Sequence, residues 1–347
     1  MNGAPHVHTI ELSATDLTAV KQVLAEVVAR FDFAEDAAFQ DEADAYAQEL
    51  PRALRTGLND FRLHEPACIC LVRGFLVDDD RLGRTPAHWL EHWPPVSTRE
   101  LDFYLFLCGS LLGSPVAWST KQRGRMVHTI APSREDADEQ LASGSSSTLT
   151  WHTEEAFHPL RSDYLALLCL RNPDAVATTF ACVHNLPAEV LGDPVLHEPR
   201  FHILPDGSHL SSAPASPVVD IPAPVRTRVA DLLARMTDTP EPVPLLFGDP
   251  GSPYLRLDQH YTHAAAGDPV AAQALEELMA AVEDGLTCYR LAPGDLCVID
   301  NYKVVHGREA FGARYDGTDR WLRRINVARD LRRSRHARVS AGSRLIV

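Results

Sequence analysis

Two side chains near the middle of the sequence have the types and spacing of metal ligands. His152 and Glu154 are separated by a single residue. On an extended segment, residues i and i+2 point to the same side, so both side chains can reach one ion. A triplet of this kind also arises by chance in a chain with 16 histidines. Taken alone, it fits a surface histidine beside an acidic run at least as well.

A second segment favours the metal site. His306 follows the apolar run of residues 296–305, and Arg320 comes 14 residues after this histidine. Two histidines and one carboxylate form the facial triad that suits Fe(II) and leaves three coordination positions open. A bidentate 2-oxo acid can take two of these positions and O₂ the third. The far carboxylate of that acid then requires a planar, permanently charged partner, which an arginine provides.

The motifs around these residues resemble those of the Fe(II)/2-oxoglutarate-dependent oxygenases, in the clavaminate synthase-like branch. Within this branch the sequence is most similar to the amino-acid hydroxylases of non-ribosomal peptide antibiotic pathways, which act on arginine or asparagine at C3. The similarity is dense over residues 120–335. The resembling stretches are residues 151–159, 170–174, 294–308 and 311–335.

The resemblance implies roles for individual residues. By position, the iron ligands would be His152, Glu154 and His306. Arg320 would pair with the C5 carboxylate of 2-oxoglutarate, and the hydroxyl of Thr178 would assist it. The neighbouring Thr179 fits the spacing equally well, and a threonine that only pairs across a strand is the structural alternative.

The resemblance also implies how the backbone groups of an amino-acid substrate are held. Arg324 lies four residues beyond the co-substrate arginine, so on one strand both side chains face the same side. It would bind the substrate's α-carboxylate, and a solvated surface charge is the alternative. The non-ligating oxygen of Glu154 would receive the α-ammonium group.

For the substrate side chain, Gln122 and Asp258 match residues that contact the guanidinium in arginine-hydroxylating relatives. A second acidic position on the lid of those relatives is His260 in this sequence. That departure puts plain arginine in doubt. A cationic side chain stays favoured, because a lone buried aspartate requires a cation. A solvent-facing lid acid is the alternative for Asp258.

The function implied by the resemblance is Fe(II)/2-oxoglutarate-dependent hydroxylation at Cβ (C3) of a free L-amino acid, with O₂ as the oxidant. The side chain would be a basic guanidino type, as in arginine, enduracididine or capreomycidine, and the product would serve antibiotic biosynthesis. Hydroxylation at Cγ, desaturation, and β-hydroxylation of a neutral amino acid such as asparagine remain alternatives. A non-catalytic jelly-roll binding protein and a structural zinc protein are disfavoured, the latter because no cysteine lies near the His/Glu pair.

The elements that must position these residues follow from hydrophobic spacing. The first 110 residues are predicted to be mostly helical, with helices over residues 14–31 and 35–50 and a buried strand over 67–77. Later strands are predicted over residues 164–171, 178–183, 296–305 and 320–329, and a helix over 269–284. This pattern indicates an antiparallel sandwich or barrel with helices outside it, in one domain covering residues 1–347. The resemblance makes the core a double-stranded β-helix, or jelly roll, over 120–335, with a lid insertion around 205–290.

The amino-acid composition limits the classes of partner that the protein is expected to bind. The 347 residues include 33 Lys and Arg against 47 Asp and Glu, a formal net charge of −14. This balance argues against nucleic acid and anionic membranes as partners. The seven cysteines form no CxxC pair and mostly lie in apolar runs, which indicates buried free thiols in a reducing cytoplasm. Neither a signal peptide nor a membrane span is expected, and the sequence does not predict the oligomeric state.

Overall fold

The computed structural model of the chain describes residues 7–91, 93–210 and 223–347. The helices are α1 Ala14–Arg30, α2 Ala37–Ala47, α3 Arg52–His64, α4 Asp79–Leu82, α5 Arg99–Ser110, α6 Ala188–Leu191, α7 Gly207–Leu210, α8 Ala223–Asp238 and α9 Pro269–Asp284. Short 3-10 helices are η1 Val96–Thr98, η2 Gln122–Gly124, η3 Val183–Asn185, η4 Pro194–His197 and η5 Leu331–Ala337. The strands are β1 Val7–Glu11, β2 Ile69–Arg73, β3 Ser114–Trp118, β4 His128–Ile130, β5 Leu149–His152, β6 Tyr164–Arg171, β7 Thr178–Cys182, β8 Phe201–Ile203, β9 Leu246–Asp249, β10 Ser252–Leu255, β11 Thr262–Ala264, β12 Thr287–Tyr289, β13 Leu296–Asp300, β14 Val304–Arg308, β15 Trp321–Ala328 and β16 Leu345–Ile346.

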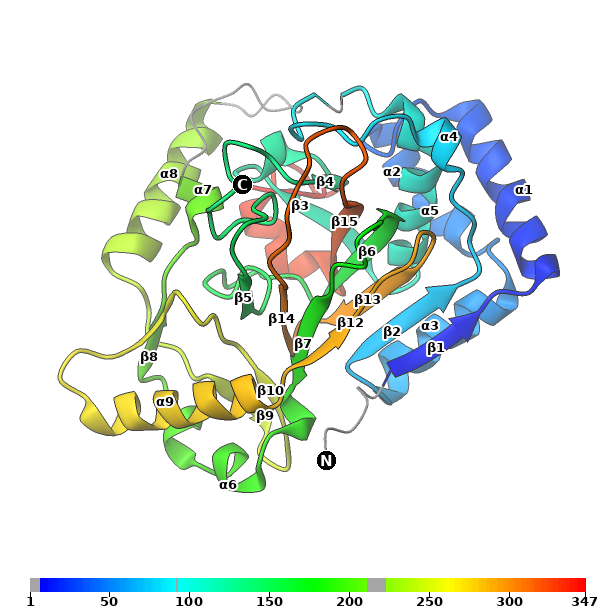
Figure 1. Cartoon of the computed structure of the whole chain (residues 1–347). Helices are drawn as coiled ribbons and strands as arrows, with labels where there is room; N and C mark the ends of the chain where they lie inside the picture. The colour runs from blue at the N-terminus through cyan, green and yellow to red at the C-terminus, as the bar shows by residue number, and fades with distance from the viewer. Residues whose placement is uncertain (1–6, 92, 211–222) are drawn as a thin grey trace.

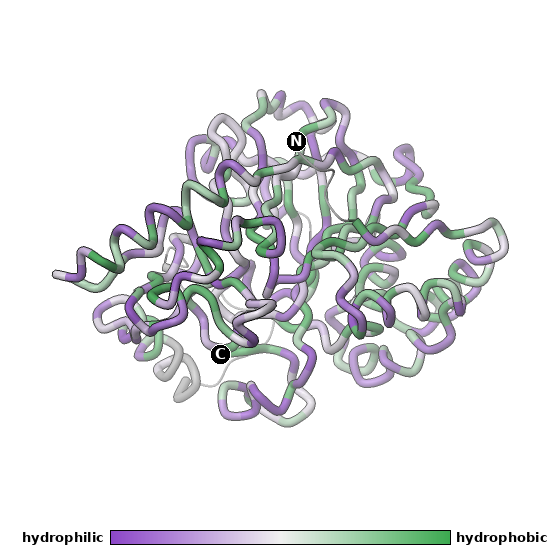
Figure 2. The backbone as a smooth tube through the Cα atoms, turned by 90° about the horizontal axis from the view of Figure 1, so that it is seen from below, coloured by the Kyte–Doolittle hydropathy of each residue, from purple (hydrophilic) through white to green (hydrophobic). Residues whose placement is uncertain are grey.

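Two sheets occupy the centre of the molecule (Figure 1). The large sheet has the strand order β1-β2-β13-β6-β15-β3-β16, with β4 also paired to β15, and the second sheet has the order β12-β7-β14-β5. One buried cluster joins the sheets, with Leu165 and Leu322 from the large sheet and Phe180 and Val304 from the second. Figure 2 shows apolar segments running through the middle of the molecule and hydrophilic segments at its periphery. The expected sheet-rich fold with flanking helices is therefore confirmed.

Strand β6 shows why the large sheet is apolar on both faces. All of its residues are buried. Successive side chains of a strand point to opposite faces. Accordingly, Leu165 and Leu167 face the second sheet, whereas Ala166 and Leu168 face the N-terminal helices. A continuous apolar run is the pattern expected for a strand covered on both sides.

The N-terminal helices cover the outer face of the large sheet. Leu24 of α1 and Phe103 of α5 share one buried cluster with Ile325 of β15. Helix α1 begins at a capping box: the Ser13 side chain accepts a hydrogen bond from the amide of Asp16, and the Asp16 carboxylate accepts one from the amide of Ser13. The structure has helices α1 to α5 in this region, and the buried strand predicted over residues 67–77 is β2, whereas β1 is a strand that the sequence did not predict.

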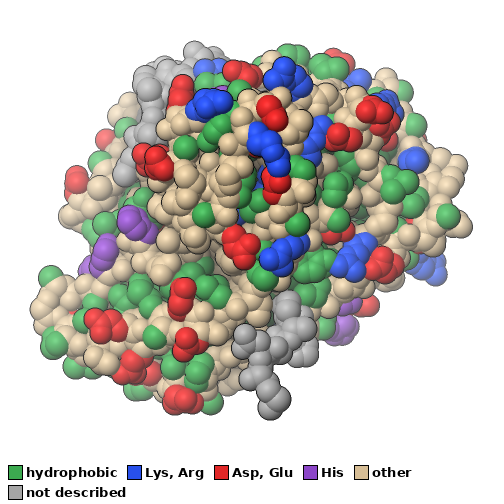
Figure 3. All heavy atoms as spheres, in the orientation of Figure 1, with side chains coloured by type: hydrophobic (Ala, Val, Ile, Leu, Met, Phe, Trp, Pro, Cys, Tyr) green, Lys and Arg blue, Asp and Glu red, His purple; other side chains and the backbone are tan. Residues whose placement is uncertain are grey.

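The segment between β7 and β12 forms a second apolar cluster beside the second sheet. It contains Leu275, Leu278 and Val282 of α9, packed with Phe201 of β8. Helix α9 has the predicted bounds, because Asp268 caps the amide of Ala271 and a proline begins the helix. Helix α9 contains no Lys or Arg, and Figure 3 shows only acidic charges on the face that it forms.

The predicted strand over residues 296–305 is wrong in one respect, because the structure divides it into β13 and β14, which belong to different sheets. The turn between them contains Asn301, which is fully buried. Its side chain accepts a hydrogen bond from the amide of Glu154 (2.7 Å) and donates to the carbonyls of Glu154 (3.0 Å) and Ser162 (2.9 Å). Because the Asn301 side chain is hydrogen-bonded to backbone groups of a distant segment, the strand ends at this turn. The pattern of hydrophobic residues along the sequence does not show where this turn lies.

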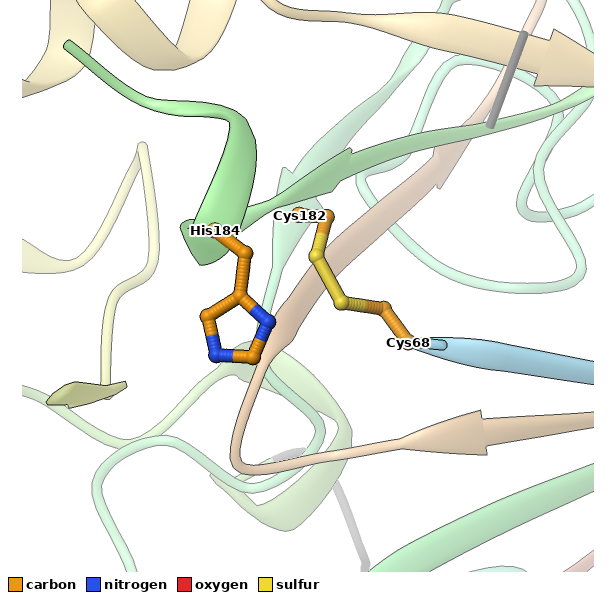
Figure 4. A group of neighbouring side chains, drawn as sticks. All are labelled: Cys68, Cys182 and His184. Carbon is orange, nitrogen blue, oxygen red and sulfur yellow. A yellow bond between two sulfur atoms is a disulfide. The ribbon is translucent and has the colours of Figure 1, made fainter. Parts of the chain in front are cut away.

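The prediction of free thiols is wrong for two of the seven cysteines. Cys68, just before β2, forms a disulfide with Cys182 at the end of β7, with a Cα–Cα distance of 6.1 Å, and His184 lies beside the bond (Figure 4). The two cysteines are 114 residues apart, so only the sheet topology brings them together. Of the remaining cysteines, Cys288 is exposed, and the buried free thiols are Cys70, Cys108, Cys169 and Cys297. Among the described residues, no helix is long and apolar enough to cross a membrane.

Candidate active site

Two neighbouring strands of the second sheet bring the predicted metal ligands together. His152 ends β5 and lies opposite His306 of β14 in the antiparallel register. The Glu154 Oε2 atom is 3.7 Å from His152 Nε2 and 3.6 Å from His306 Nε2. One ligand atom from each residue therefore lies within 4.8 Å of the other two. The side chain of His152 is oriented by a 2.9 Å contact between Nδ1 and the carbonyl of Thr150, which turns Nε2 toward the carboxylate.

The glycine after His306 has a geometric reason. A Cβ atom on Gly307 would lie 2.5 Å from the carbonyl oxygen of Leu149. Only glycine therefore allows β14 to approach β5 this closely. This close approach places the two histidine rings with their centroids 4.6 Å apart.

The three side chains fit an Fe(II) ion. Two imidazole nitrogens and one carboxylate oxygen converge, which is the facial donor set of non-haem iron centres. His306 is buried and its pKa is lowered to about 3, mainly by desolvation, so the ring is neutral as a metal ligand must be. Burial lowers the pKa of His152, but Glu154 and Asp258 outweigh it and raise the value to about 9 in the metal-free protein. A bound cation would replace the proton at this position.

The second carboxylate oxygen of Glu154 contacts two cationic side chains. Its Oε1 atom is 2.9 Å from Arg324 Nη1 and 3.3 Å from Lys121 Nζ. Burial opposes ionisation of this carboxyl, but Arg324 and Lys121 hold its pKa well below the usual range. Glu154 is therefore ionised, with one oxygen toward the histidines and the other toward the cavity's cations.

A buried guanidinium lies at one end of the site. Arg320 precedes β15, is 7% exposed, and donates from Nη2 to Thr178 Oγ1 at 3.3 Å. Its Nε has no hydrogen-bond partner among the described residues, and no carboxylate of those residues lies within ion-pair distance. Burial lowers its pKa to about 10. An arginine left without an anion in this way fits a carboxylate of 2-oxoglutarate. Of the two threonines considered from the sequence, Thr178 is therefore the one that is hydrogen-bonded to Arg320.

Because successive side chains of a strand point to opposite faces, the two adjacent arginines of β15, Arg323 and Arg324, have different surroundings. Arg324 lines the same cavity as Arg320, where its Nη2 also lies 3.0 Å from His128 Nδ1. Arg323 points to the opposite face and forms a bidentate ion pair with Asp102 of α5, at 2.7 and 2.8 Å. One of the two adjacent arginines therefore attaches the helical layer, and the other faces the metal ligands.

The cavity that contains these groups has a volume of about 410 Å³. Asp258 lines it beside His152, to which it is joined by an isolated antiparallel bridge. Its Oδ1 accepts hydrogen bonds from the amides of His260 (2.8 Å) and Tyr261 (2.9 Å). Burial raises the pKa of the carboxyl. Within the described part of the chain, no Lys or Arg forms an ion pair with it, and its charged neighbour in the metal-free protein is His152.

Two predicted substrate residues are placed differently. Gln122 lines the cavity, but its amide is occupied by Thr129 of β4, whose amide donates to Oε1 (3.0 Å) and whose carbonyl accepts from Nε2 (2.8 Å). His260 is exposed and does not line the cavity. Its neighbour Tyr261 lines the cavity.

Sequence reasoning missed the residue that lies nearest to the acidic groups of the site. Lys121, directly before Gln122, is buried and contacts Glu154, Glu155 and Asp206. These three carboxylates outweigh desolvation and raise its pKa. No local spacing rule identifies such a lysine, because Asp206 lies far along the chain. The sequence signal available was only the position of Lys121 beside a candidate substrate residue.

A two-histidine, one-carboxylate site beside a buried arginine, between two sheets, defines the class of non-haem Fe(II) oxygenases that consume a 2-oxo acid. Comparisons with known proteins agree. Residues 223–326 match the family model "Taurine catabolism dioxygenase TauD, TfdA family". The chain is 44% identical to enduracididine beta-hydroxylase of Streptomyces hygroscopicus over 97% of this chain and 99% of that protein. It is 37% identical to L-ornithine/L-arginine 3-hydroxylase of Catenulispora acidiphila over 98% and 100%.

Among solved structures, the chain is similar to the non-heme iron oxygenase OrfP in complex with Fe, succinate and (3S)-hydroxy-L-Arg. The TM-score is 0.89 with 39% identity, over 98% of this chain and 99% of that one. OrfP has also been solved with Fe and alpha-ketoglutaric acid. The chain belongs to the TauD/TfdA family of Fe(II)/2-oxoglutarate-dependent oxygenases. It is a 2-oxoglutarate-dependent dioxygenase that uses Fe(II) and O₂.

Proposed function

We propose that this enzyme hydroxylates Cβ of a free L-amino acid whose side chain carries a guanidino-type cation, such as arginine, enduracididine or capreomycidine, within antibiotic biosynthesis. The observation that carries the proposal is Asp258, a partly buried carboxylate that lines the metal cavity and forms no ion pair with a Lys or Arg of the described residues. A carboxylate that is partly withdrawn from water and has no Lys or Arg partner favours the binding of a cation beside it. The two similar curated proteins, named for enduracididine and for ornithine and arginine, support the same class of substrate.

Different residues of the cavity bind the metal, the co-substrate and the amino acid. His152, Glu154 and His306 would hold Fe(II), which would supply the oxidative chemistry by which O₂ and 2-oxoglutarate give succinate and CO₂, with one oxygen atom entering succinate and the other the substrate. Arg320 and Thr178 bind the C5 carboxylate of 2-oxoglutarate. Fixing this end of the co-substrate orients its 2-oxo acid end toward the metal ligands.

The amino-acid substrate is held at both of its ends. Arg324 binds the α-carboxylate, and Asp258 binds the cationic side chain. Arg324 is bonded to Glu154 Oε1 in the described structure. When a substrate carboxylate takes this guanidinium, the same oxygen of Glu154 becomes available to the α-ammonium group. A zwitterion thus replaces an internal ion pair with two pairs of its own, and only a free amino acid can make both.

Anchoring at both ends decides which C–H bond faces the metal. The α-groups at Arg324 and Glu154 keep Cα close to the ligands, and Asp258 draws the side chain along the cavity wall. We expect this arrangement to present Cβ to the metal ligands. A small shift along the same path would bring Cγ forward, so the distance between the two anchors determines the site of oxidation.

We further propose that the two sheets form a double-stranded β-helix, the jelly roll expected for the family, within one oxygenase domain over residues 1–347. The antiparallel order β12-β7-β14-β5 opposite the large sheet supports this assignment. The lid insertion corresponds to the segment around 205–290. A cytoplasmic location remains a prediction, and the enzyme's partner is its small-molecule substrate.

Turnover of an amino-acid panel tests the proposal. Arginine, enduracididine, capreomycidine, ornithine, histidine and asparagine are assayed with Fe(II), 2-oxoglutarate and O₂ for succinate and for a product 16 mass units heavier. We expect the guanidino compounds to be hydroxylated. In Asp258→Asn, we expect their KM to rise about 100-fold, because the charge-assisted pair is lost. Turnover of neutral amino acids alone, or an unchanged KM in the variant, would contradict the assignment of Asp258.

A further inference from the structure

A second group of metal-ligating side chains lies at one end of the two sheets and contains none of the iron ligands. Cys68 lies just before β2 of the large sheet, Cys182 ends β7 of the second sheet, and His184 lies in η3. One ligand atom from each of these residues lies within 4.8 Å of the other two. Figure 4 shows the imidazole ring beside the two sulfur atoms. Because Cys68 comes from a distant strand, no CxxC spacing marks this group in the sequence.

The ring of His184 has the orientation of a ligand. Its Nε2 lies 3.3 Å from the hydroxyl of Ser252, at the start of β10. The other nitrogen, Nδ1, is on the side of the sulfur atoms (Figure 4). A histidine that binds a metal through one nitrogen has its other nitrogen hydrogen-bonded in this way. Burial, and then the charge of Lys303, lower the pKa of His184, so its ring is neutral at pH 7.

The backbone positions of the two cysteines suit a metal as well as a disulfide. Their Cα atoms are 6.1 Å apart. In a tetrahedral site with Zn–S bonds of about 2.3 Å, the two sulfur atoms lie about 3.8 Å apart. Rotation of the two side chains about their Cα–Cβ bonds gives this separation while the strands stay in place. The same pair of cysteines can therefore hold a metal ion when it is reduced.

Burial separates these two cysteines from the other thiols of the chain. His184 is exposed, Cys182 is half-buried and Cys68 is 4% exposed, so the group is open to solvent on the side of the histidine. A metal ion and a reductant can both reach it from there. Desolvation raises the pKa of the other buried thiols, which therefore stay protonated and bind metals poorly: Cys70, Cys108, Cys169 and Cys297.

We propose that in the reduced protein Cys68, Cys182 and His184 bind Zn²⁺, and that this ion joins the large sheet to the second sheet. Two thiolates and an imidazole are ligands that Zn²⁺ prefers, and water takes the fourth position, because no further ligand among the described residues belongs to the group. The disulfide and the metal site exclude each other. A thiol or phosphine reductant supplies the two electrons that, with two protons, convert the disulfide into two thiols, and Zn²⁺ then replaces the two protons.

Absorption of bound Co²⁺ tests the site, because cobalt replaces zinc and its bonds to thiolates give a charge-transfer band in the near ultraviolet. The full chain is reduced with a phosphine, separated from the reductant without air and titrated with Co²⁺. We expect a band that saturates at one Co²⁺ per chain and that Zn²⁺ abolishes. Air-oxidised protein should give no band. The iron site has no sulfur ligand, so His152→Ala should keep the band.

Single variants identify the ligands. Cys68→Ser, Cys182→Ser and His184→Ala should each weaken Co²⁺ binding at this site by about 100-fold or more, since each removes a ligand. Ser252→Ala, which removes only the partner of the second ring nitrogen, should weaken it about tenfold. Cys288→Ser is the matched control, because this thiol is exposed and lies outside the group, and it should keep the wild-type band.

A count of thiols tests the proposal without any variant. Reduced protein left in air with Zn²⁺ should keep all seven thiols reactive in denaturant, whereas protein left in air with a chelator should keep five. No cobalt band in the reduced wild type, a band that survives both cysteine substitutions, or equal thiol counts with Zn²⁺ and with chelator would overturn the proposal. Thermal unfolding checks that each variant is folded.

Discussion

At the scale of single residues, the surroundings of Arg320 define its role most narrowly. Arg320 has no carboxylate partner among the described residues, yet burial makes an uncompensated guanidinium expensive. Arg323, three positions further along the chain, is also buried but pairs with Asp102. The contrast between the two marks Arg320 as a binding residue and Arg323 as a structural one.

Substitution Arg320→Ala should therefore act on the co-substrate. We expect the KM for 2-oxoglutarate to rise about 100-fold, because the charge-assisted bonds to its C5 carboxylate are lost. The KM for the amino acid should change much less. Steady-state succinate formation at varied 2-oxoglutarate measures both values. Arg332→Ala, at a side chain that is 91% exposed, is the control. A wild-type KM for 2-oxoglutarate in Arg320→Ala would show that the carboxylate binds elsewhere.

At the scale of elements, the sequence predicted those helices and strands whose bounds depend on contacts between residues close in the chain. The cap of α1, the bounds of α9 and the buried strand β6 follow from residues close in sequence. The pair His152 and Glu154 was predictable for the same reason, since the two residues are two positions apart, whereas the third ligand, His306, was identified from its motif and the resemblance. The turn at Asn301 and the position of Lys121 were not predictable, because their partners lie far along the chain and belong to the tertiary fold.

The attachment of the helical layer to the large sheet has a pH dependence. The Glu35 carboxyl, just before α2, accepts a hydrogen bond from the amide of Val127 at 3.4 Å, and its other oxygen is buried without a partner. Desolvation, and then Asp102, raise its pKa from 4.5 to about 7. Below pH 4.5 the carboxyl is neutral in both the folded and the unfolded chain. As the pH rises toward 7, only the unfolded chain ionises freely, so the folded state loses stability and does not regain it at higher pH.

Glu35→Gln should remove this loss. We expect the variant to match the wild type near pH 4 and to be more stable by about 3 kcal/mol above pH 7, the value of the pKa shift. Urea unfolding at the two pH values gives the difference. The exposed Glu49→Gln should show no such pH-dependent gain. An equal effect of Glu35→Gln at both pH values would mean that Glu35 does not titrate in this range.

At the scale of the whole molecule, an acidic protein binds anions in its interior. The formal net charge is −14, yet residues 303–338 contain 11 Lys and Arg against four Asp and Glu. Three of these arginines, Arg308, Arg320 and Arg324, line the cavity together with Lys121. Burial of the positive groups, and acidic side chains on outer elements such as α9, explain how the average charge conceals the binding site.

The two sheets are also joined covalently at one end, by Cys68 and Cys182. In protein purified in air without reductant, we therefore expect five of the seven thiols to react with a thiol reagent in denaturant. After reduction all seven should react. Because the bond closes a loop of about 114 residues, reduction should lower the unfolding temperature of the wild type but not of Cys68→Ser. Seven reactive thiols before reduction would show that the bond does not form.

The central claim is that this oxygenase places a hydroxyl group on Cβ of a guanidino amino acid. The most direct measurement is nuclear magnetic resonance of the product formed from enduracididine or arginine with Fe(II), 2-oxoglutarate and ¹⁸O₂, with succinate counted in parallel. The account predicts one ¹⁸O atom on Cβ and one succinate for each product. Oxygen on another carbon, a product two mass units lighter, or succinate formed without any oxidised amino acid would contradict it.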